Sequence, residues 1–157
     1  MSTRREFLQA GGCLMMLLGA SLGLSKELEA LPVGWIDGET NPAGNERSYA
    51  IPAGDGVNVD RGAQVLLARY QGYLYAFSLA CPHQQAVVEW LPRDHRFQCT
   101  KHGSRYTPQG VYMSGRATRN LDRFAIRKDA AQAIVSLTLW FQSDKDPAGW
   151  NAARIPV

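Results

Sequence analysis

The chain has 157 residues, of which 45% are hydrophobic and 20% are charged, and its formal net charge is +3. This composition is typical of one soluble globular domain, and it excludes an intrinsically disordered chain and a multi-span membrane protein. Lys and Arg residues are scattered without a run or a helical stripe, so nucleic acid is not an expected partner.

The N-terminal segment differs from the rest of the chain. Residues 2–8 read S-T-R-R-E-F-L and precede an apolar run, a combination that resembles a twin-arginine export signal. Residues 1–24 are therefore predicted to form a signal with an apolar helix. The apolar run is about 17 residues long, the lower limit for crossing a bilayer, and no clean A-x-A cleavage site follows it. These features favour an uncleaved anchor that holds the protein on the periplasmic side of the cytoplasmic membrane. Cys13 lies in this run and is expected to be a buried apolar residue, with lipidation as the alternative.

The remainder of the chain is predicted to be a neck followed by an all-β domain. Residues 25–45 are rich in Gly, Pro, Asn and acidic side chains and are expected to form an irregular, flexible lead-in, and the domain is expected at residues 46–157. Alternating apolar and polar residues predict strands at 47–51, 63–70, 73–79, 87–91, 96–99, 124–127 and 133–140. Gln71-Gly72 predicts a hairpin turn, and residues 92–94 predict another break, so neighbouring strands are expected to pair antiparallel.

Two short motifs carry the candidate chemistry. Cys81-Pro82-His83 is followed by Cys99-Thr100-Lys101-His102, which gives the pattern C-x-H-x15-C-x-x-H. Each motif follows a predicted strand, so two neighbouring loops would bring two thiolates and two imidazoles around one site.

Two other arrangements of these residues are open from the pattern alone. One is a structural Cys2His2 zinc site. Zinc knuckles usually hold a thiolate pair on one turn, however, whereas each motif here mixes Cys with His. The other is a disulfide between Cys81 and Cys99, which would leave both histidines unexplained. The two mixed pairs therefore favour a site for two metals of unequal character.

The motif resembles that of the Rieske proteins, and the resemblance covers roughly residues 63–127. It continues through His102-Gly103-Ser104-Arg105-Tyr106, which matches the family pattern H-G-S-x-Y, and through residues 115–121. The resemblance implies an antiparallel β-sandwich with a subdomain that binds a 2Fe-2S cluster.

The same resemblance assigns roles to six residues. Cys81 and Cys99 would bind the buried iron, and His83 and His102 would bind the outer iron. The Ser104 hydroxyl would donate a hydrogen bond to a bridging sulfide, and the Tyr106 hydroxyl would donate one to a cysteine sulfur. Both hydrogen bonds would raise the reduction potential. His95 is the only other histidine and is expected in a solvated turn. The chain cannot supply the two-histidine, one-carboxylate iron site of a Rieske oxygenase, so that class is excluded.

The leading hypothesis is that the chain is the iron–sulfur subunit of a cytochrome bc-type quinol oxidase, with cytochrome b and c-type subunits as partners. In that family the residue corresponding to His102 contacts quinol, so electron and proton transfer are coupled. Ala86 and Lys101 stand where the family usually has disulfide-forming cysteines, and residues 115–121 lack the usual prolines. The alternatives are the small subunit of an exported arsenite-oxidase-like molybdenum enzyme, whose partner is a molybdopterin-binding chain, and a free-standing ferredoxin-like carrier.

Overall fold

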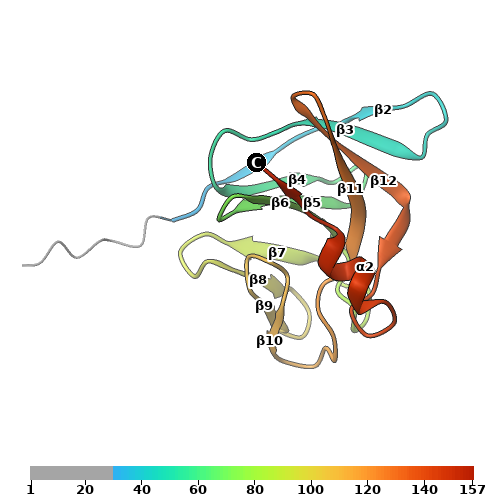
Figure 1. The fold of residues 1–157 in the computed structure, drawn as a ribbon. Helices are drawn as coiled ribbons and strands as arrows, with labels where there is room; N and C mark the ends of the chain where they lie inside the picture. The colour runs from blue at the N-terminus through green and yellow to red at the C-terminus, as the bar shows by residue number, and fades with distance from the viewer. Residues whose placement is uncertain (1–29) are drawn as a thin grey trace, which may run out of the picture.

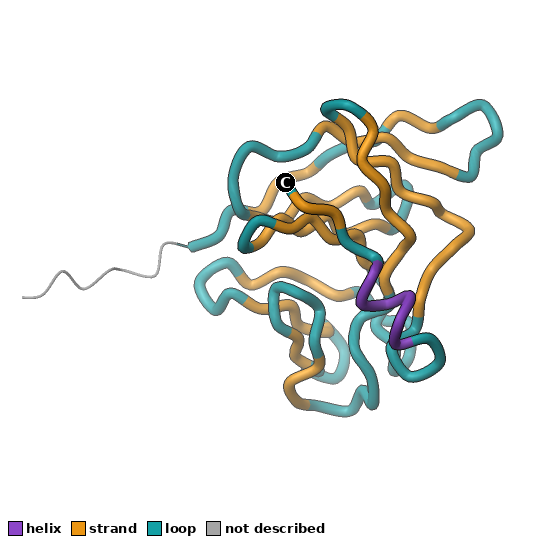
Figure 2. Tube along the Cα trace, in the orientation of Figure 1, coloured by secondary structure: helices purple, strands orange, loops and turns teal. Residues whose placement is uncertain are grey.

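The computed structural model describes residues 30–157, which form two β-sheets and one short helix (Figures 1 and 2). The larger sheet contains β1 (Val33–Trp35), β2 (Glu39–Thr40), β3 (Glu46–Ala50), β4 (Gly56–Asp60), β5 (Val65–Tyr70), β6 (Tyr73–Ser78), β11 (Arg123–Asp129), β12 (Gln132–Phe141) and β13 (Ile155–Pro156). The smaller sheet contains β7 (Val88–Leu91), β8 (Arg96–Cys99), β9 (Arg105–Tyr106) and β10 (Tyr112–Ser114), and the helix is α2 (Pro147–Ala152). No helix in this part of the chain is long and apolar enough to cross a membrane. The predicted signal, its apolar helix and Cys13 lie outside the described residues.

The prediction of an all-β fold is confirmed, and all seven predicted strands are present within two residues of their expected ends. The predicted hairpin at Gln71-Gly72 joins β5 to β6 with Tyr70 opposite Tyr73. Both turn residues have positive φ, 50° and 78°, as the two-residue turn that matches strand twist requires. The break at residues 92–94 joins β7 to β8, which pair antiparallel.

The expectation of an irregular lead-in is wrong for part of residues 25–45, because β1 and β2 lie within that range. β1 pairs with β4, and β2 pairs with β3. The β1–β4 pair is parallel, so the large sheet is not purely antiparallel. These strands have two or three residues each, too few to show a period, and β1 pairs with a strand well beyond it in the sequence, with Val33 opposite Val57. Local pattern therefore could not reveal them.

β5 and β6 lie between two hydrophobic cores, and this explains their continuous apolar sequences. Leu66 and Phe77 face one core while Leu67 and Ala76 face the other, and all four are fully buried. One core extends to the smaller sheet and includes Val57, Val59, Leu66, Ala68, Tyr75, Phe77, Leu79, Cys81, Val88, Trp90, Phe97, Cys99, Tyr106, Ala117 and Leu121. The other lies against β3 and β12 and includes Tyr49, Val65, Leu67, Leu74, Ala76, Phe124, Ala133, Val135 and Ile155.

The smaller sheet is held against β6 by aromatic packing, and in Figure 1 it forms a separate layer below the large sheet. The ring of Phe97 on β8 meets Phe77 edge-on at 5.6 Å and Trp90 at 4.8 Å, measured between ring centroids. Such contacts add to the apolar area that these large side chains bury. The loops at the end of β6 and β8 are thereby fixed relative to the large sheet.

Candidate metal centre

The two candidate loops lie side by side because β7 and β8 form a hairpin. Val88, the first residue of β7, is opposite Cys99, the last residue of β8, and an isolated bridge joins Ala80 to Val87. Both loops therefore emerge from the same end of the hairpin. Thr100 strengthens their contact by donating its backbone N–H and its hydroxyl to the Val87 carbonyl, each at 3.0 Å.

The two loops share one backbone design. The N–H of Cys81 donates to the carbonyl of Ala86, five residues later, and the N–H of Cys99 donates to the carbonyl of Ser104, also five residues later. In the opposite direction, Gln85 and Gly103 each donate to the carbonyl of the cysteine four residues earlier. These two residues also share a left-handed conformation, with φ of 58° and 64°. Each loop thus closes tightly around its cysteine.

The two cysteine side chains form a buried pair. Cys81 and Cys99 are each 1% exposed, and both are free thiols. Burial, the largest influence, raises the pKa of the Cys81 thiol. Burial also opposes ionisation of Cys99, but N–H groups of His102 and Lys101 that point at its sulfur outweigh this and lower its pKa. The loops therefore supply N–H groups that stabilise negative charge on sulfur in an otherwise apolar setting.

The two histidine side chains form a second, half-exposed pair. The Nδ1 atoms of His83 and His102 lie 3.3 Å apart, and the rings meet at 79°. Two nitrogens bound tetrahedrally to one metal at the usual bond length would lie roughly 3.4 Å apart. Partial removal from water, followed by repulsion from His83, Lys101 and Arg116, lowers the pKa of His102 and favours the neutral ring that binds metals.

The donor set is thus two pairs of different chemistry. Among residues 30–157, no group of three or more His, Cys, Asp or Glu side chains is placed to hold a single metal ion. A 2Fe-2S cluster of the Rieske type takes two thiolates on one iron and two imidazoles on the other. A buried sulfur pair beside a half-exposed nitrogen pair fits that group. The role of the four residues as ligands remains a prediction.

Tyr106 lies in the place that its predicted role requires. Its ring is fully buried, and its hydroxyl oxygen is 3.4 Å from the Sγ of Cys81. Burial, together with the hydrogen bond to Cys81, raises the pKa of this phenol well above its usual value. The hydroxyl therefore stays protonated and can donate to sulfur.

Ser104 is also fully buried, and its hydroxyl is held by a third loop. The Oγ atom accepts hydrogen bonds from the backbone N–H groups of Arg116 at 3.1 Å and Ala117 at 3.0 Å. Because both lone pairs are engaged, the Ser104 hydroxyl can act only as a donor. A hydroxyl that can only donate has the polarity that the predicted role of Ser104 requires.

The loop at residues 115–121, singled out in the sequence, supports the Ser104 segment. Gly115 has φ of 112°, and a Cβ atom there would lie 2.4 Å from the Cα of Ser104, so only glycine fits. The Asn120 side chain accepts from the N–H of Tyr112, and the Leu121 side chain is fully buried. The Gly, Ala, Asn and Leu of this segment therefore have structural roles.

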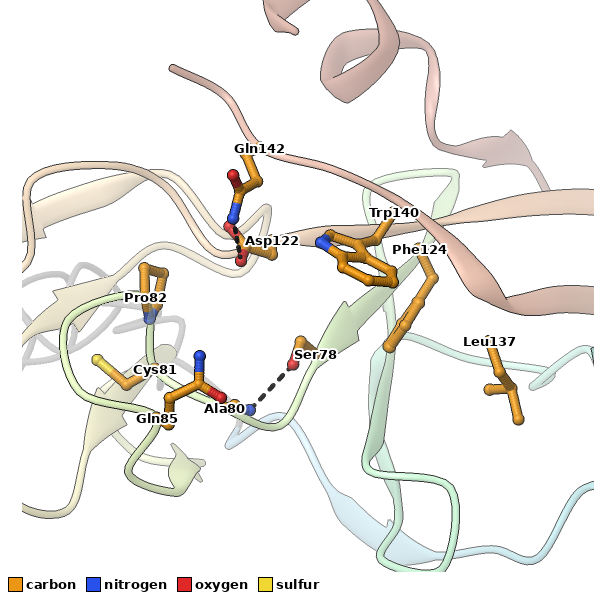
Figure 3. A pocket seen from close by; sticks show the side chains of 10 residues that line it. All are labelled: Ser78, Ala80, Cys81, Pro82, Gln85, Asp122, Phe124, Leu137, Trp140 and Gln142. Carbon is orange, nitrogen blue, oxygen red and sulfur yellow. Dashed lines mark hydrogen bonds between the residues drawn. The ribbon is translucent and has the colours of Figure 1, made fainter. Parts of the chain in front are cut away.

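A cavity of about 320 Å³ lies beside the first loop (Figure 3). Cys81, Pro82 and Gln85 form one side, and Trp140 on β12 lies across from them. The Nε2 of Gln142 donates to Asp122 at 3.3 Å along its rim. This cavity borders the backbone around Cys81 and is separate from the histidine pair.

Arg123 is a buried residue that sequence analysis missed. It is 3% exposed, and its guanidinium donates to the carbonyls of Trp150 and Gln109, both at 2.7 Å. Burial lowers its pKa to about 10. Arg123 joins α2 to the turn between β9 and β10. An arginine at the start of a strand normally indicates a solvated position, so the sequence carries no signal for this role.

Comparisons with known proteins match the middle of the chain. A family model of the Rieske [2Fe-2S] domain matches residues 44–125. The chloroplastic cytochrome b6-f complex iron–sulfur subunits of Bigelowiella natans and Chlamydomonas reinhardtii are 31% and 30% identical over 70 residues. These alignments cover 45% of this chain but only 27% and 34% of the two relatives. The plasma membrane Rieske protein of Synechocystis PCC 6803 has a TM-score of 0.42 and 23% identity, covering 60% of this chain and 88% of that one.

Proposed function

Because the chain belongs to the Rieske [2Fe-2S] family, we propose that it transfers single electrons and that its cluster is held by Cys81, His83, Cys99 and His102. The observation that carries the assignment is the buried sulfur pair beside the half-exposed Nδ1 pair. When bound, the cluster supplies a one-electron couple at a potential raised by its histidine ligands.

The surrounding residues adjust that couple and control access to it. The Tyr106 hydroxyl points at the Cys81 sulfur, and the Ser104 hydroxyl is restricted to donation. Both groups stabilise added negative charge on sulfur and so favour the reduced form. The cysteines are buried, whereas His83 and His102 are partly exposed, so electrons would enter and leave on the histidine side.

We infer that the protein works as the iron–sulfur subunit of a cytochrome bc-type complex. The similarity to cytochrome b6-f subunits supports this inference, although the matches span about a third of those relatives. In this proposal His102 contacts quinol, and cytochrome b and c-type subunits are the partners. An anchor at residues 1–24 would hold the domain on the periplasmic side, with residues 25–45 as its connection.

The cluster assignment is tested on the purified full chain. Reduced wild-type protein should give a Rieske-type electron paramagnetic resonance signal and contain iron and acid-labile sulfide in equal amounts. Cys99→Ser should abolish the signal, whereas Cys13→Ser, which changes the cysteine outside both motifs, should retain it. Stoichiometric zinc with no signal in the wild type would refute the assignment.

The bc-type assignment needs a separate test in native membranes. His102→Leu should abolish quinol-dependent reduction of the cytochromes. The control is His95→Leu, which removes a histidine from the β7–β8 turn and should retain quinol oxidation. Co-purification with a molybdopterin-binding chain and no cytochrome b would instead assign the protein to the alternative complex.

A further inference from the structure

Positive charge is concentrated in the loops around the two histidines. The segments 80–87, 100–107 and 114–121 contain no Asp or Glu, but they contain Lys101, Arg105, Arg116 and Arg119. Arg119 is neutralised by ion pairs with Asp122 and Asp144. The other three are exposed, and within residues 30–157 none of them forms an ion pair with a carboxylate.

Two of these charges lie beside the half-exposed imidazole of His102. Lys101 is its neighbour in sequence, and Arg116 is held close by the bond from its N–H to the Ser104 hydroxyl, 3.1 Å long. The positive charges of both act on the His102 ring. We call Lys101 and Arg116 the basic rim.

Exposed apolar side chains occur in segments next to those that carry Lys101 and Arg116. Val87 is 49% exposed, and its carbonyl is bonded to Thr100 of the second loop. Met113 is 55% exposed and lies just before the Gly115 turn that carries Arg116. Apolar side chains bordered by like charges are typical of a protein interface, where the apolar part provides contact and the charges select the partner.

We propose that the basic rim is the docking surface for a redox partner protein that presents an acidic face. The proposal rests on the proposed function, because the rim borders the histidine side through which electrons would pass. A lipid surface has the same negative charge but cannot exchange electrons, so a protein is the occupant that this position favours. Complementary charge would accelerate encounter and orient the partner's cofactor toward the imidazoles.

The test compares electron exchange with two forms of one protein, native equine cytochrome c, which is basic, and its succinylated form, which is acidic. Stopped-flow rate constants are measured for both forms with the full-length wild type and with Lys101→Glu/Arg116→Glu. The ratio of the succinylated to the native rate constant should fall about tenfold or more in the double variant, and the difference should diminish as salt is added. A change in the cluster's potential alters both rate constants in the same direction, so the ratio isolates docking.

Arg93→Glu is the matched control. Arg93 is also exposed but lies in the turn at the opposite end of the β7–β8 hairpin from the cysteines. It should leave the ratio within twofold of the wild-type value. An unchanged ratio in the double variant, or an equal fall in Arg93→Glu, would overturn the proposal.

Further measurements distinguish loss of docking from loss of the cluster and from lipid binding. The paramagnetic resonance signal shows that each variant retains its cluster, so a docking failure is distinguishable from failure of the proposed function. If the double charge reversal loses the signal, Lys101→Gln/Arg116→Gln should still lower the ratio. Binding of phosphatidylglycerol vesicles in preference to phosphatidylcholine vesicles that depends on Lys101 and Arg116, with an unchanged ratio, would assign the charges to lipid and refute the proposal.

Discussion

Gln85 and Gly103 occupy equivalent places in the two loops, each four residues after a cysteine and each with a left-handed backbone. Only one of them is glycine. A side chain in this conformation costs about 1 kcal/mol, and the cost is lower for residues that bond locally.

We predict that Gly103→Ala destabilises the protein by about 1 kcal/mol, because alanine at φ of 64° is strained. Gln85→Gly should relieve strain and leave the free energy of unfolding within about 0.5 kcal/mol of the wild type, since glycine is more flexible when unfolded. Urea unfolding followed by circular dichroism measures both. If Gln85→Gly destabilised the protein as much as Gly103→Ala, the two positions would not share the left-handed strain that makes the loops equivalent.

Tyr106→Phe should lower the reduction potential while retaining the cluster. The change removes the hydroxyl that lies 3.4 Å from the Cys81 sulfur, and so removes a bond worth about 1–2 kcal/mol in the more negative, reduced form. Redox titration followed by paramagnetic resonance gives the shift. Tyr70→Phe, which alters a hydroxyl at the β5–β6 turn, should leave the potential unchanged.

Asp60 should make stability depend on pH in the acid range. Its buried carboxylate accepts bonds from Ala63, Tyr49 and Gly38. Burial alone would raise its pKa, but these bonds and the charge of Arg47 together lower it below its usual value of 3.8.

Because the folded pKa is lowered, the unfolded state binds the proton first as pH falls. The contribution of Asp60 is complete well above pH 4 and decreases as pH falls through about 4 toward the folded pKa. Asp60→Asn should cost about 1–3 kcal/mol at neutral pH and weaken this acid dependence. Urea unfolding between pH 3 and 7 measures the effect, and Asp129→Asn, at an exposed carboxylate, should match the wild type.

Removal of the Arg123 guanidinium should be severely destabilising. Arg123→Met leaves the carbonyls of Trp150 and Gln109 without their donor, and we expect a loss of about 2–4 kcal/mol. Arg127→Met, on the same strand but with an exposed side chain, should cost less than 1 kcal/mol. The two variants are compared by thermal and urea unfolding. Equal losses would show that burial of Arg123 does not decide its contribution.

The parts of the fold that sequence analysis predicted are those with a local signal. The strands that form β5 and β6 have long apolar runs and a two-residue turn between them, so both could be predicted with their hairpin. β1 and β2 have only three and two residues, too few to show a period, so an irregular segment was the wrong expectation there.

The same distinction holds at the site. Cys81 and Cys99 were found because the spacing of Cys and His is itself the signal, and Tyr106 because it stands at a fixed offset from His102. Arg123 could not be found, because its partners are backbone carbonyls that any residue can supply. The clustering of Lys101 and Arg116 is likewise invisible until the fold brings residues fifteen apart to one imidazole.

The position of β5 and β6 between two cores has a thermodynamic consequence. Leu66 and Leu67 are successive residues of β5, yet each belongs to a different core. Neither core can therefore unfold without displacing a strand that also packs in the other core. We expect the domain to unfold in one cooperative transition. Occupancy of the metal centre would then raise the midpoint for the whole domain, including β3 and β12 on its far side, because a ligand that binds only the native state stabilises every part that unfolds with it.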